Sequence, residues 1–297
     1  MTLRQRPVGV IGTGLMGMAC AKRLLEAGFE VLGHDTEAKK LEPFVALGGR
    51  AARSVADIAR ACDKVVIAVF STDQVEDTVA GPGGLLASRP EDAPPLTAIC
   101  VSTCDPDRIA ALAARLPTAR LRYVEAPVSG TSEQTARGES LGLIGGDPAV
   151  VDAARDVIEA ICPRWHPLGA AGNGGRAKLA INLILGINRA ALAEGLVFAE
   201  RMGLAPEAFL KVARESAAYS QIMDIKGGKM LNGDFSPQGY VAQSLKDFSL
   251  MLDQARRLKQ QLPLGETYAG LMKGCVAAGE GELDNSVVIR EIRRRTG

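Results

Sequence analysis

Two polar residues, Lys178 and Asn182, lie four positions apart within the strongly apolar stretch Gly172–Gly203. The length of this stretch predicts a helix, and residues four apart share one helix face. Because the helix is apolar around its circumference, it should be buried on nearly every side. A buried ammonium takes a partner or a lowered pKa, and an amine of lowered pKa can exchange protons near neutral pH. Lys178 is therefore a candidate general acid/base, although it could also extend to solvent from the first helical turn.

A glycine motif near the N-terminus indicates a second chemical function. Gly12, Gly14 and Gly17 form GxGxxG, directly after the apolar run Pro7–Ile11 and before a helical pattern that ends at Gly28. In this context the first glycine permits a turn, the second lets the backbone approach a pyrophosphate, and the third allows close packing of helix and strand. The phosphates would lie at the helix N-terminus, where N–H groups and the dipole favour anions.

The acidic residue Asp35 follows the next strand-like run, Glu30–His34, about 20 residues beyond the motif. An acid at this position accepts hydrogen bonds from the ribose hydroxyls and repels a 2′-phosphate, so NAD is expected to be preferred. NADP remains possible, because Lys39 and Lys40 could soften the repulsion. Asp35 could also cap the segment that follows it.

Later apolar runs also end in polar residues. Lys64–Phe70 leads into Ser71, and Thr97–Val101 leads into Thr103. Ligands of doubly wound sheets bind at the carboxyl ends of the strands, so these residues are expected along the cofactor. The run Leu121–Glu125 continues into a loop at Ser129–Thr131, whose N–H groups and hydroxyls could hold an anion.

The periodicity changes along the chain and predicts two domains. Strand-like and helical runs alternate up to Leu168, which is typical of a doubly wound, Rossmann-type α/β domain over residues 1–168. An all-α domain is expected over residues 169–297, with the long helix Gly172–Gly203 at the junction. Its further helical patterns are Pro206–Ala217, Tyr240–Gln261, Leu264–Ala278 and Ser286–Arg295.

Composition excludes several classes of protein. The net charge of +1 argues against a nucleic-acid partner, which requires a strong basic excess. Six cysteines without a CxxC pair indicate reduced thiols, and with only two histidines no metal site is expected. The N-terminal apolar run is too short for a signal peptide, and the most apolar helix has only Leu179–Asn188 between charges. These features predict a cytoplasmic protein with no membrane partner.

Four motifs, in order, resemble the β-hydroxyacid dehydrogenase family, the group of 3-hydroxyisobutyrate dehydrogenase and tartronate semialdehyde reductase. GTGLMG is similar to the family's cofactor fingerprint, EAPVSG to its substrate loop DAPVSGG, GNGGRAKLAIN to its signature GxGxxxKxxxN, and SLKD to its late KD pair. These motifs lie at Gly12–Gly17, Glu125–Gly130, Gly172–Asn182 and Ser244–Asp247. The resemblance covers essentially the whole chain.

The resemblance implies an NAD(P)-dependent dehydrogenase that interconverts a small 3-hydroxy acid and its semialdehyde or keto acid by hydride transfer. It makes Lys178 the general acid/base, with Asn182 orienting the lysine or the hydroxyl. The substrate carboxylate would be held by Ser129, Gly130 and Thr131. It also implies association of the helical domains, as a homodimer or homotetramer. The expected cofactor-binding residues are Gly12, Thr13, Gly14, Leu15, Met16, Gly17, Asp35, Phe70, Ser71, Thr103 and Lys246.

One position departs from the family pattern. Thr131 stands where the family commonly has a second glycine. Its backbone N–H is expected to remain available to an anion, while its side chain reshapes the substrate pocket, so the identity of the hydroxy acid stays open. Two alternatives are an imine reductase, which usually lacks this lysine, and a cofactor-binding interaction module without turnover. The presence of Lys178 argues against both.

Overall fold

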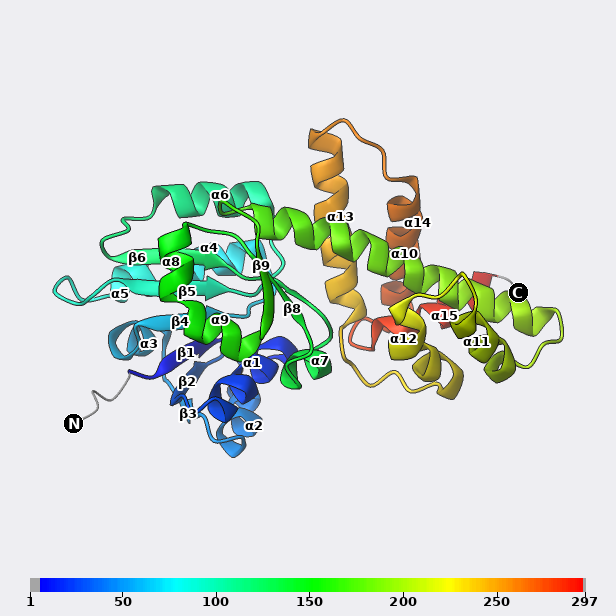
Figure 1. Ribbon diagram of the computed structural model, residues 1–297, viewed down its shortest axis with the longest axis horizontal. Helices are drawn as coiled ribbons and strands as arrows, with labels where there is room; N and C mark the ends of the chain where they lie inside the picture. The colour runs from blue at the N-terminus through cyan, green and yellow to red at the C-terminus, as the bar shows by residue number, and fades with distance from the viewer. Residues whose placement is uncertain (1–5, 296–297) are drawn as a thin grey trace. The chain divides into compact units, whose positions relative to one another are not determined.

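The computed structural model describes residues 6–295, and the chain divides into two compact units, Met1–Lys178 and Leu179–Gly297. The first unit contains a parallel sheet covered by helices, and the second is helical (Figure 1). This α/β architecture with a helical C-terminal part is the predicted fold class. Helix α10 (Asn173–Arg201) is continuous across the division of the chain.

The first unit is built on six parallel strands in the order β3-β2-β1-β4-β5-β6. The order reverses between the adjacent strands β1 and β4, and ligands of such sheets bind at the carboxyl ends of the strands near that point. The strands are β1 (Val8–Ile11), β2 (Val31–His34), β3 (Arg50–Ala51), β4 (Lys64–Ile67), β5 (Leu96–Cys100) and β6 (Leu121–Glu125).

Both faces of this sheet are buried, which explains why its strands read as continuous apolar runs. Successive side chains point to opposite faces. On β4, Val66 belongs to one hydrophobic core, whereas Val65 and Ile67 belong to the other. On β5, Ile99 joins the first core and Ala98 the second. The central strands therefore stabilise two helical layers at once.

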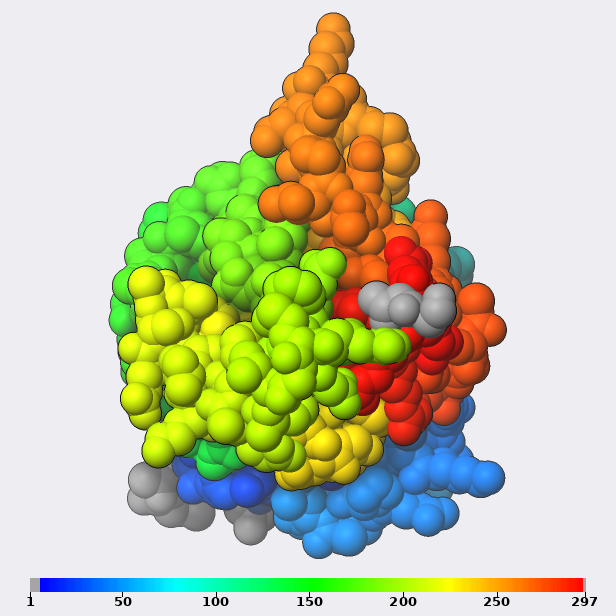
Figure 2. Space-filling view, turned by 90° about the vertical axis from the view of Figure 1, so that its right-hand side faces the viewer, coloured from blue at the N-terminus to red at the C-terminus, as the bar shows by residue number. Residues whose placement is uncertain are grey.

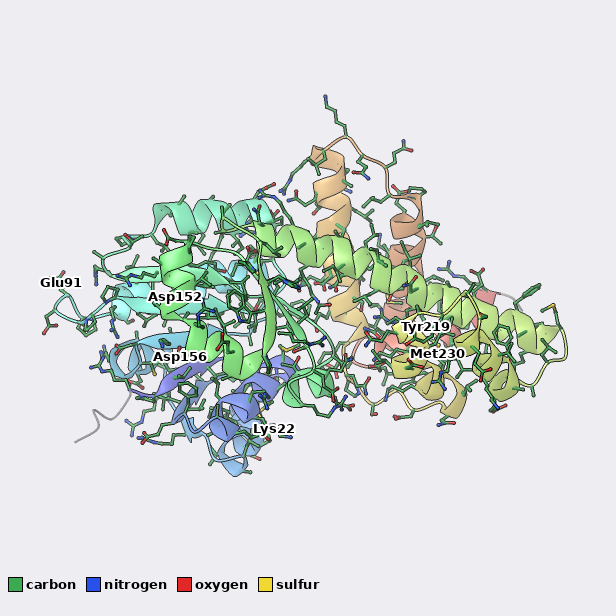
Figure 3. The ribbon with its side chains drawn as sticks, viewed as in Figure 1. Lys22, Glu91, Asp152, Asp156, Tyr219 and Met230 are labelled. Carbon is green, nitrogen blue, oxygen red and sulfur yellow. The ribbon has the colours of Figure 1, made fainter. Side chains whose placement is uncertain are left out.

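The helices of the first unit mostly follow strands, as the alternating pattern predicts. They are α1 (Leu15–Glu26), η1 (Ala38–Lys40), α2 (Leu41–Ala46), α3 (Val55–Ala61), α4 (Thr72–Ala80), α5 (Leu85–Ser88), α6 (Pro106–Arg115), α7 (Ser132–Ala136), α8 (Pro148–Ala153) and α9 (Arg155–Ile161). Helices α8 and α9 are separated at Ala154, where the backbone leaves helical geometry. Side chains of α8 and α9 such as Asp152 and Asp156 lie on the outside of this unit (Figure 3), and Lys64 Nζ donates to Asp156 at 2.6 Å.

A second sheet of three strands, in the order β7-β8-β9, lies in the same unit. Its strands are β7 (Val128–Ser129), β8 (Leu141–Ile144) and β9 (Arg164–Pro167). β7 pairs with β8 in antiparallel fashion, with Ser129 opposite Leu141. The expected substrate loop thus begins on a strand, which fixes the direction of its first residues.

The second unit packs its helices around one hydrophobic core. Besides α10 it contains α11 (Pro206–Glu215), α12 (Gln221–Asn232), α13 (Val241–Arg257), α14 (Pro263–Ala277), η2 (Asn285–Val287) and α15 (Val288–Arg295). The sequence pattern does not predict α12, because Gly227 and Gly228 in its interior resemble a helix break. Burial of Ile222, Met223 and Met230 in the core outweighs this cost.

Helix α10 is not buried on nearly every side, contrary to expectation. Leu192, Leu196 and Val197 face the core of the second unit, whereas Ile184 is 60% exposed and Phe198 63%. The C-terminal end of α10 and the loop after it lie on the surface in Figure 2, in yellow-green. The apolar residues of this helix therefore exceed what the core of one chain covers.

Candidate active site

The three glycines of the Gly12–Gly17 turn serve different physical purposes. Gly12 has a φ of +88°, and a Cβ there would lie 2.5 Å from the carbonyl oxygen of Ala68. A Cβ on Gly17 would lie 1.8 Å from the carbonyl oxygen of Gly12, so this glycine allows α1 to start against the turn. A Cβ on Gly14 would meet no atom of residues 6–295 within 4 Å, and α1 has no side-chain cap from these residues. The helix start is thus open to an anion, which fits a dinucleotide pyrophosphate.

Asp35 lies beside this turn and is held by it. One carboxylate oxygen accepts hydrogen bonds from the N–H of Thr13 at 2.8 Å and from its hydroxyl at 3.3 Å. The other accepts the N–H of Glu37 at 2.9 Å, so Asp35 also makes the local contact with the following segment that the sequence allowed. The oxygen that accepts the N–H of Glu37 can accept a second hydrogen bond. Asp35 is partly exposed, and its position at the end of β2 suits a ribose hydroxyl.

Further residues expected to contact the cofactor follow the ends of β4 and β5. Phe70 is 48% exposed, and its N–H donates to Oε1 of Gln74 at 2.8 Å. Ser71 caps α4 in a capping box with the same glutamine. Ser102 donates to the carbonyl of Val69 at 2.7 Å and ties the two strand ends together, while its neighbour Thr103 is buried.

The loop at Ser129–Thr131 differs from its expected state in one respect. Thr131 caps α7, and its N–H donates to Oε1 of Gln134 at 2.9 Å, so this N–H is not available to an anion as expected. The Thr131 hydroxyl in turn accepts the N–H of Gln134 at 3.1 Å. The pattern TSEQ, a threonine followed three residues later by glutamine, is the sequence signal of this capping box. Gly130, with a φ of +153° and Ser140 beside it, has no room for a side chain.

The candidate acid/base Lys178 is buried, with 8% of its surface exposed. Its Nζ donates a hydrogen bond of 2.6 Å to the carbonyl oxygen of Val128. Val128 directly precedes Ser129, so the ammonium lies at the base of the loop expected to bind the substrate. The alternative in which this lysine extends to solvent is wrong for the folded chain.

A residue that the sequence reasoning did not single out holds the start of the lysine helix. Glu125, at the end of β6, accepts the N–H of Gly172 at 2.7 Å and the N–H of Gly175 at 2.9 Å. Burial raises the pKa of this carboxyl to about 7, although the backbone N–H groups oppose the shift. The first letter of the EAPVSG motif was the available signal.

Within the second unit, α10 and α13 bring together a group of polar side chains. Asn182 Nδ2 donates to Oδ2 of Asp247 at 3.0 Å, and Lys246 Nζ lies 3.0 Å from Oδ1 of the same aspartate. Asp247 is buried and so fixes two residues that the sequence had singled out. Its own part was missed, although it belongs to the quoted SLKD motif.

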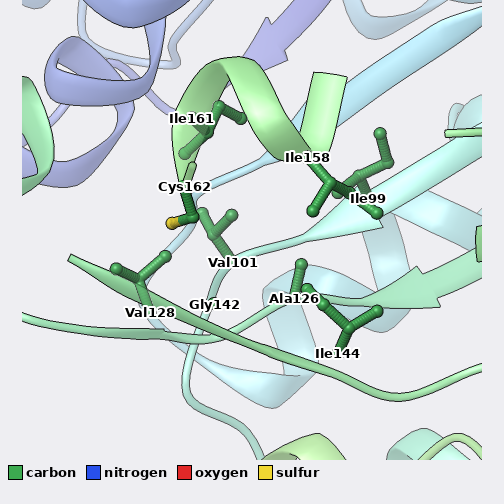
Figure 4. A pocket seen from close by; sticks show the side chains of 9 residues that line it. All are labelled: Ile99, Val101, Ala126, Val128, Gly142, Ile144, Ile158, Ile161 and Cys162. Carbon is green, nitrogen blue, oxygen red and sulfur yellow. The ribbon is translucent and has the colours of Figure 1, made fainter. Parts of the chain in front are cut away.

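The strand that carries the lysine's partner also borders a small apolar cavity. Val128 and Ala126 contribute to its wall, together with Cys162 from the end of α9 (Figure 4). The lining is almost entirely aliphatic, so the cavity does not suit a charged ligand. The polar contact of Val128, which is with Lys178, lies instead next to the loop after β7.

Two family descriptions match the chain and together cover nearly all of it. Residues 7–169 match the NAD binding domain of 6-phosphogluconate dehydrogenase. Residues 172–292 match the domain described as NAD-binding of NADP-dependent 3-hydroxyisobutyrate dehydrogenase. The resemblance found in the four motifs is thus found again over whole domains.

Individual proteins give the same result. An L-threonate dehydrogenase from Cupriavidus necator is 34% identical over 286 residues, which cover 96% of this chain and 95% of that protein. Cytokine-like nuclear factor N-PAC from Homo sapiens is 27% identical and covers 98% of this chain, which spans about half (52%) of that longer relative. The crystal structure of a 3-hydroxyisobutyrate dehydrogenase from Salmonella typhimurium covers 96% of this chain and 99% of its own, with a TM-score of 0.86 at 28% identity.

Proposed function

The chain belongs to the β-hydroxyacid dehydrogenase family, and on this premise we propose that it oxidises a small 3-hydroxy acid with Lys178 as the general acid/base. Its class, an NAD(P)-dependent 3-hydroxyacid dehydrogenase, follows from the family.

The observation that carries the proposal is the contact between Lys178 Nζ and the carbonyl oxygen of Val128, at 2.6 Å. This contact fixes a buried amine one residue before the loop Ser129–Thr131. An alcohol releases hydride efficiently only if its proton is removed as the carbonyl forms, so a base must lie near the reacting oxygen. The neutral amine of a lysine can donate to a carbonyl and accept a proton on its lone pair.

Within this scheme the loop recognises the substrate carboxylate. Ser129 and Gly130 supply N–H groups and a hydroxyl, and Thr131 supplies its hydroxyl, since its N–H is taken by Gln134. Lys178 would hold the proton at Nζ, with Asn182 orienting the substrate hydroxyl or the lysine. We place Lys246 on the nicotinamide side of the cofactor. When bound, the nicotinamide supplies the acceptor for the hydride.

We propose NAD as the preferred cofactor, because the Asp35 carboxylate would repel a 2′-phosphate. Its contact with the Thr13 N–H, at 2.8 Å, keeps it at the glycine turn. Replacement by alanine, Asp35→Ala, should lower the ratio of kcat/KM with NAD to that with NADP by about tenfold, a change of roughly 1.4 kcal/mol. An unchanged ratio would assign Asp35 to the turn alone.

We further propose that residues 1–168 bind the dinucleotide and that residues 169–297 mediate assembly into a homodimer or homotetramer. Ile184, Ala191 and Phe198, each exposed and seven residues apart, form an apolar stripe along α10. By length and composition α10 is also long and apolar enough to cross a membrane, a property that core helices of soluble proteins share. We assign it to the core and subunit contacts of a soluble, cytoplasmic enzyme, because eight of its residues belong to one core or pack on it: Leu179, Leu183, Leu185, Ala190, Leu192, Ala193, Leu196 and Val197.

Replacing Phe198 by glutamate tests this assembly. The charge should abolish association of the purified protein at micromolar concentration, as measured by light scattering. A monomeric wild-type chain would contradict the proposal directly.

The experiment that tests the function is cofactor reduction with a panel of hydroxy acids: L-threonate, 3-hydroxyisobutyrate, glycerate and, as a mismatch, the 2-hydroxy acid lactate. Turnover of one or more of the first three, but not of lactate, is expected. Binding of NAD(P) without turnover of any acid would favour the cofactor-binding module. Reduction of a cyclic imine in place of these acids would favour the imine reductase.

A further inference from the structure

We propose that Glu125 is a positioning residue, which holds the first turn of α10 in register with β6 and thereby places Lys178 at the substrate loop. This inference rests on the proposed function of Lys178. The Glu125 carboxylate binds backbone N–H groups at the start of α10, so its effect on Lys178 passes through the backbone of that helix.

Two residues, Glu125 and Val128, hold the start of α10 in place. Glu125 accepts the N–H groups of Gly172 and Gly175, at 2.7 and 2.9 Å, and three residues later the carbonyl of Val128 accepts the ammonium of Lys178. Glu125 and Gly175 are 50 residues apart, as are Val128 and Lys178. The segment EAPV and the start of α10 therefore meet in one fixed register.

The glycines around Glu125 show that the chain makes room for this carboxylate. A Cβ on Gly175 would lie 2.7 Å from Oε1 of Glu125, and a Cβ on Gly145 would lie 2.8 Å from its Oε2. A Cβ on Gly174 would lie 3.2 Å from the same Oε2. Two of these three glycines belong to the signature before Lys178. Their role here is to admit an internal carboxylate to the helix start.

Other helices of the first unit begin in a simpler way. Each of α3, α4, α6, α7 and α8 is capped by the residue directly before its first turn, for example Ser54 on α3 and Asp105 on α6. Helix α10 is instead capped by Glu125, which comes from the distant strand β6. Only 3% of this residue is exposed to solvent. Burying a carboxylate is costly, so a local cap would start the helix more cheaply. The cap from Glu125 also fixes the start of α10 relative to β6, which a local cap does not do.

Few charges surround this carboxylate. On α10, Arg176 favours its ionised form, but this arginine also pairs with Asp107 of α6 at 2.9 Å. On β5 and β6 the neighbours are Cys100 and Tyr123, and burial holds the pKa of that phenol well above its usual range. The backbone N–H groups of α10 are therefore the principal partners of the Glu125 carboxylate.

The test compares Glu125→Gln with the matched exposed variant Glu139→Gln, which lies in the same unit and pairs with Arg137 through its side chain. Glutamine keeps the shape of the side chain but turns an amide N–H₂ toward the donors of α10. A misplacement of about 1 Å costs up to a hundredfold in rate, so kcat of Glu125→Gln should fall about tenfold to a hundredfold. The dissociation constant for NAD should stay within about twofold, and Glu139→Gln should match the wild type.

The same substitution is then made in a Lys178→Ala background. If Glu125 acts only through Lys178, its removal should change the residual rate less than about twofold, because the two effects are not additive. Equal fold losses in both backgrounds would overturn the proposal, since Glu125 would then act on the fold or the cofactor. A kcat within about twofold of wild type for Glu125→Gln alone would also overturn it.

Glu125→Asp keeps the proposal testable if the glutamine variant does not fold. A carboxylate one methylene shorter should retain part of the contact with the start of α10. We therefore expect Glu125→Asp to lower kcat about threefold or more when Lys178 is present, and not to lower the residual rate of Lys178→Ala. Equal losses in the two backgrounds contradict the proposal. Failure of the proposed function would appear separately, as high activity of the single Lys178→Ala variant.

Discussion

Two helices of this chain begin at glycine-rich turns, and the turns are used in opposite ways. At α1, a Cβ on Gly14 would meet nothing within 4 Å in the described part of the chain, and no side chain there caps the helix. At α10, the corresponding space beside Gly174 and Gly175 is filled by the carboxylate of Glu125. Both helix starts favour a negative group. The first leaves that place to a ligand, and the second fills it from within.

The difference teaches that a glycine-rich helix start does not by itself indicate a phosphate site. The group that faces the glycines decides whether the helix start can bind a phosphate. In the first turn, as we propose, the glycines let the backbone approach an external anion, the pyrophosphate of the cofactor. In the second they bring the backbone close to an internal anion, and the helix start becomes a rigid support for Lys178, one turn further along.

The largest effect is expected at Lys178, which the start of α10 supports. General acid/base catalysis contributes about 10²–10⁴-fold, so Lys178→Ala should lose roughly that much kcat. Lys178→Arg should be similarly poor, because a guanidinium does not release its proton at accessible pH. Steady-state kinetics with cofactor titration measure this, with unchanged NAD affinity as the control. Retention of more than about a tenth of the activity would assign Lys178 to the structure alone.

A side chain at the first turn should act on the cofactor only. Gly14→Ala places a methyl group in open space next to the helix start, where the pyrophosphate is expected. We expect NAD to bind about tenfold more weakly or worse, roughly 1.4 kcal/mol, with thermal stability within about 1 kcal/mol of wild type. Isothermal titration and thermal melts measure the two quantities. Normal NAD affinity would show that the pyrophosphate lies elsewhere.

A side chain at the second turn should have the reverse effect. The methyl group of Gly175→Ala would meet Oε1 of Glu125 at 2.7 Å and displace it from the helix start. We expect kcat to fall about tenfold while NAD affinity is unchanged. Gly228→Ala, in α12 with nothing among residues 6–295 within 4 Å of its Cβ, is the matched control and should keep full activity. Loss of cofactor binding in Gly175→Ala would break the contrast between the two turns.

A smaller effect is expected in the pH dependence of stability. The pKa of Glu125 is raised in the folded chain to about 7, from an ordinary value of 4.5, because burial penalises its ionised form. The folded state therefore binds this proton more tightly, so the stabilisation is complete below about pH 4.5 and is lost as the pH rises through about 7. Relative to Glu125→Gln, the wild type should lose stability between about pH 5 and 8, by up to roughly 3 kcal/mol. Parallel curves for the two proteins, from chemical unfolding at each pH, would contradict this.

Much of the fold can be read from the sequence, because buried parallel strands are apolar throughout and their ends carry the glycines and Asp35. Helix α12 could not be read, since Gly227 and Gly228 weaken its local preference and only tertiary burial restores it. The capping box of Thr131 and Gln134 has a sequence signal, a threonine followed three residues later by a glutamine, but the same loop also suits an anion, and only the fold shows that Gln134 takes the N–H.

The two residues that hold the candidate site in place, Glu125 and Asp247, are harder to predict from the sequence. Glu125 meets Gly172 across 47 residues, and Asp247 meets Asn182 across 65. No local periodicity reports such contacts. Only the assembled fold shows that a carboxylate faces the helix start and that a second one holds the asparagine.

The most direct test of the central claim is the pH dependence of kcat for alcohol oxidation, from about pH 5.5 to 10, in the wild type and in Lys178→Ala. If Lys178 removes the hydroxyl proton, the wild-type rate climbs with pH through an ionisation that the alanine variant lacks, and the variant stays slow and nearly independent of pH. An alanine variant with the same climb as the wild type would contradict the account, because the base would then be another group.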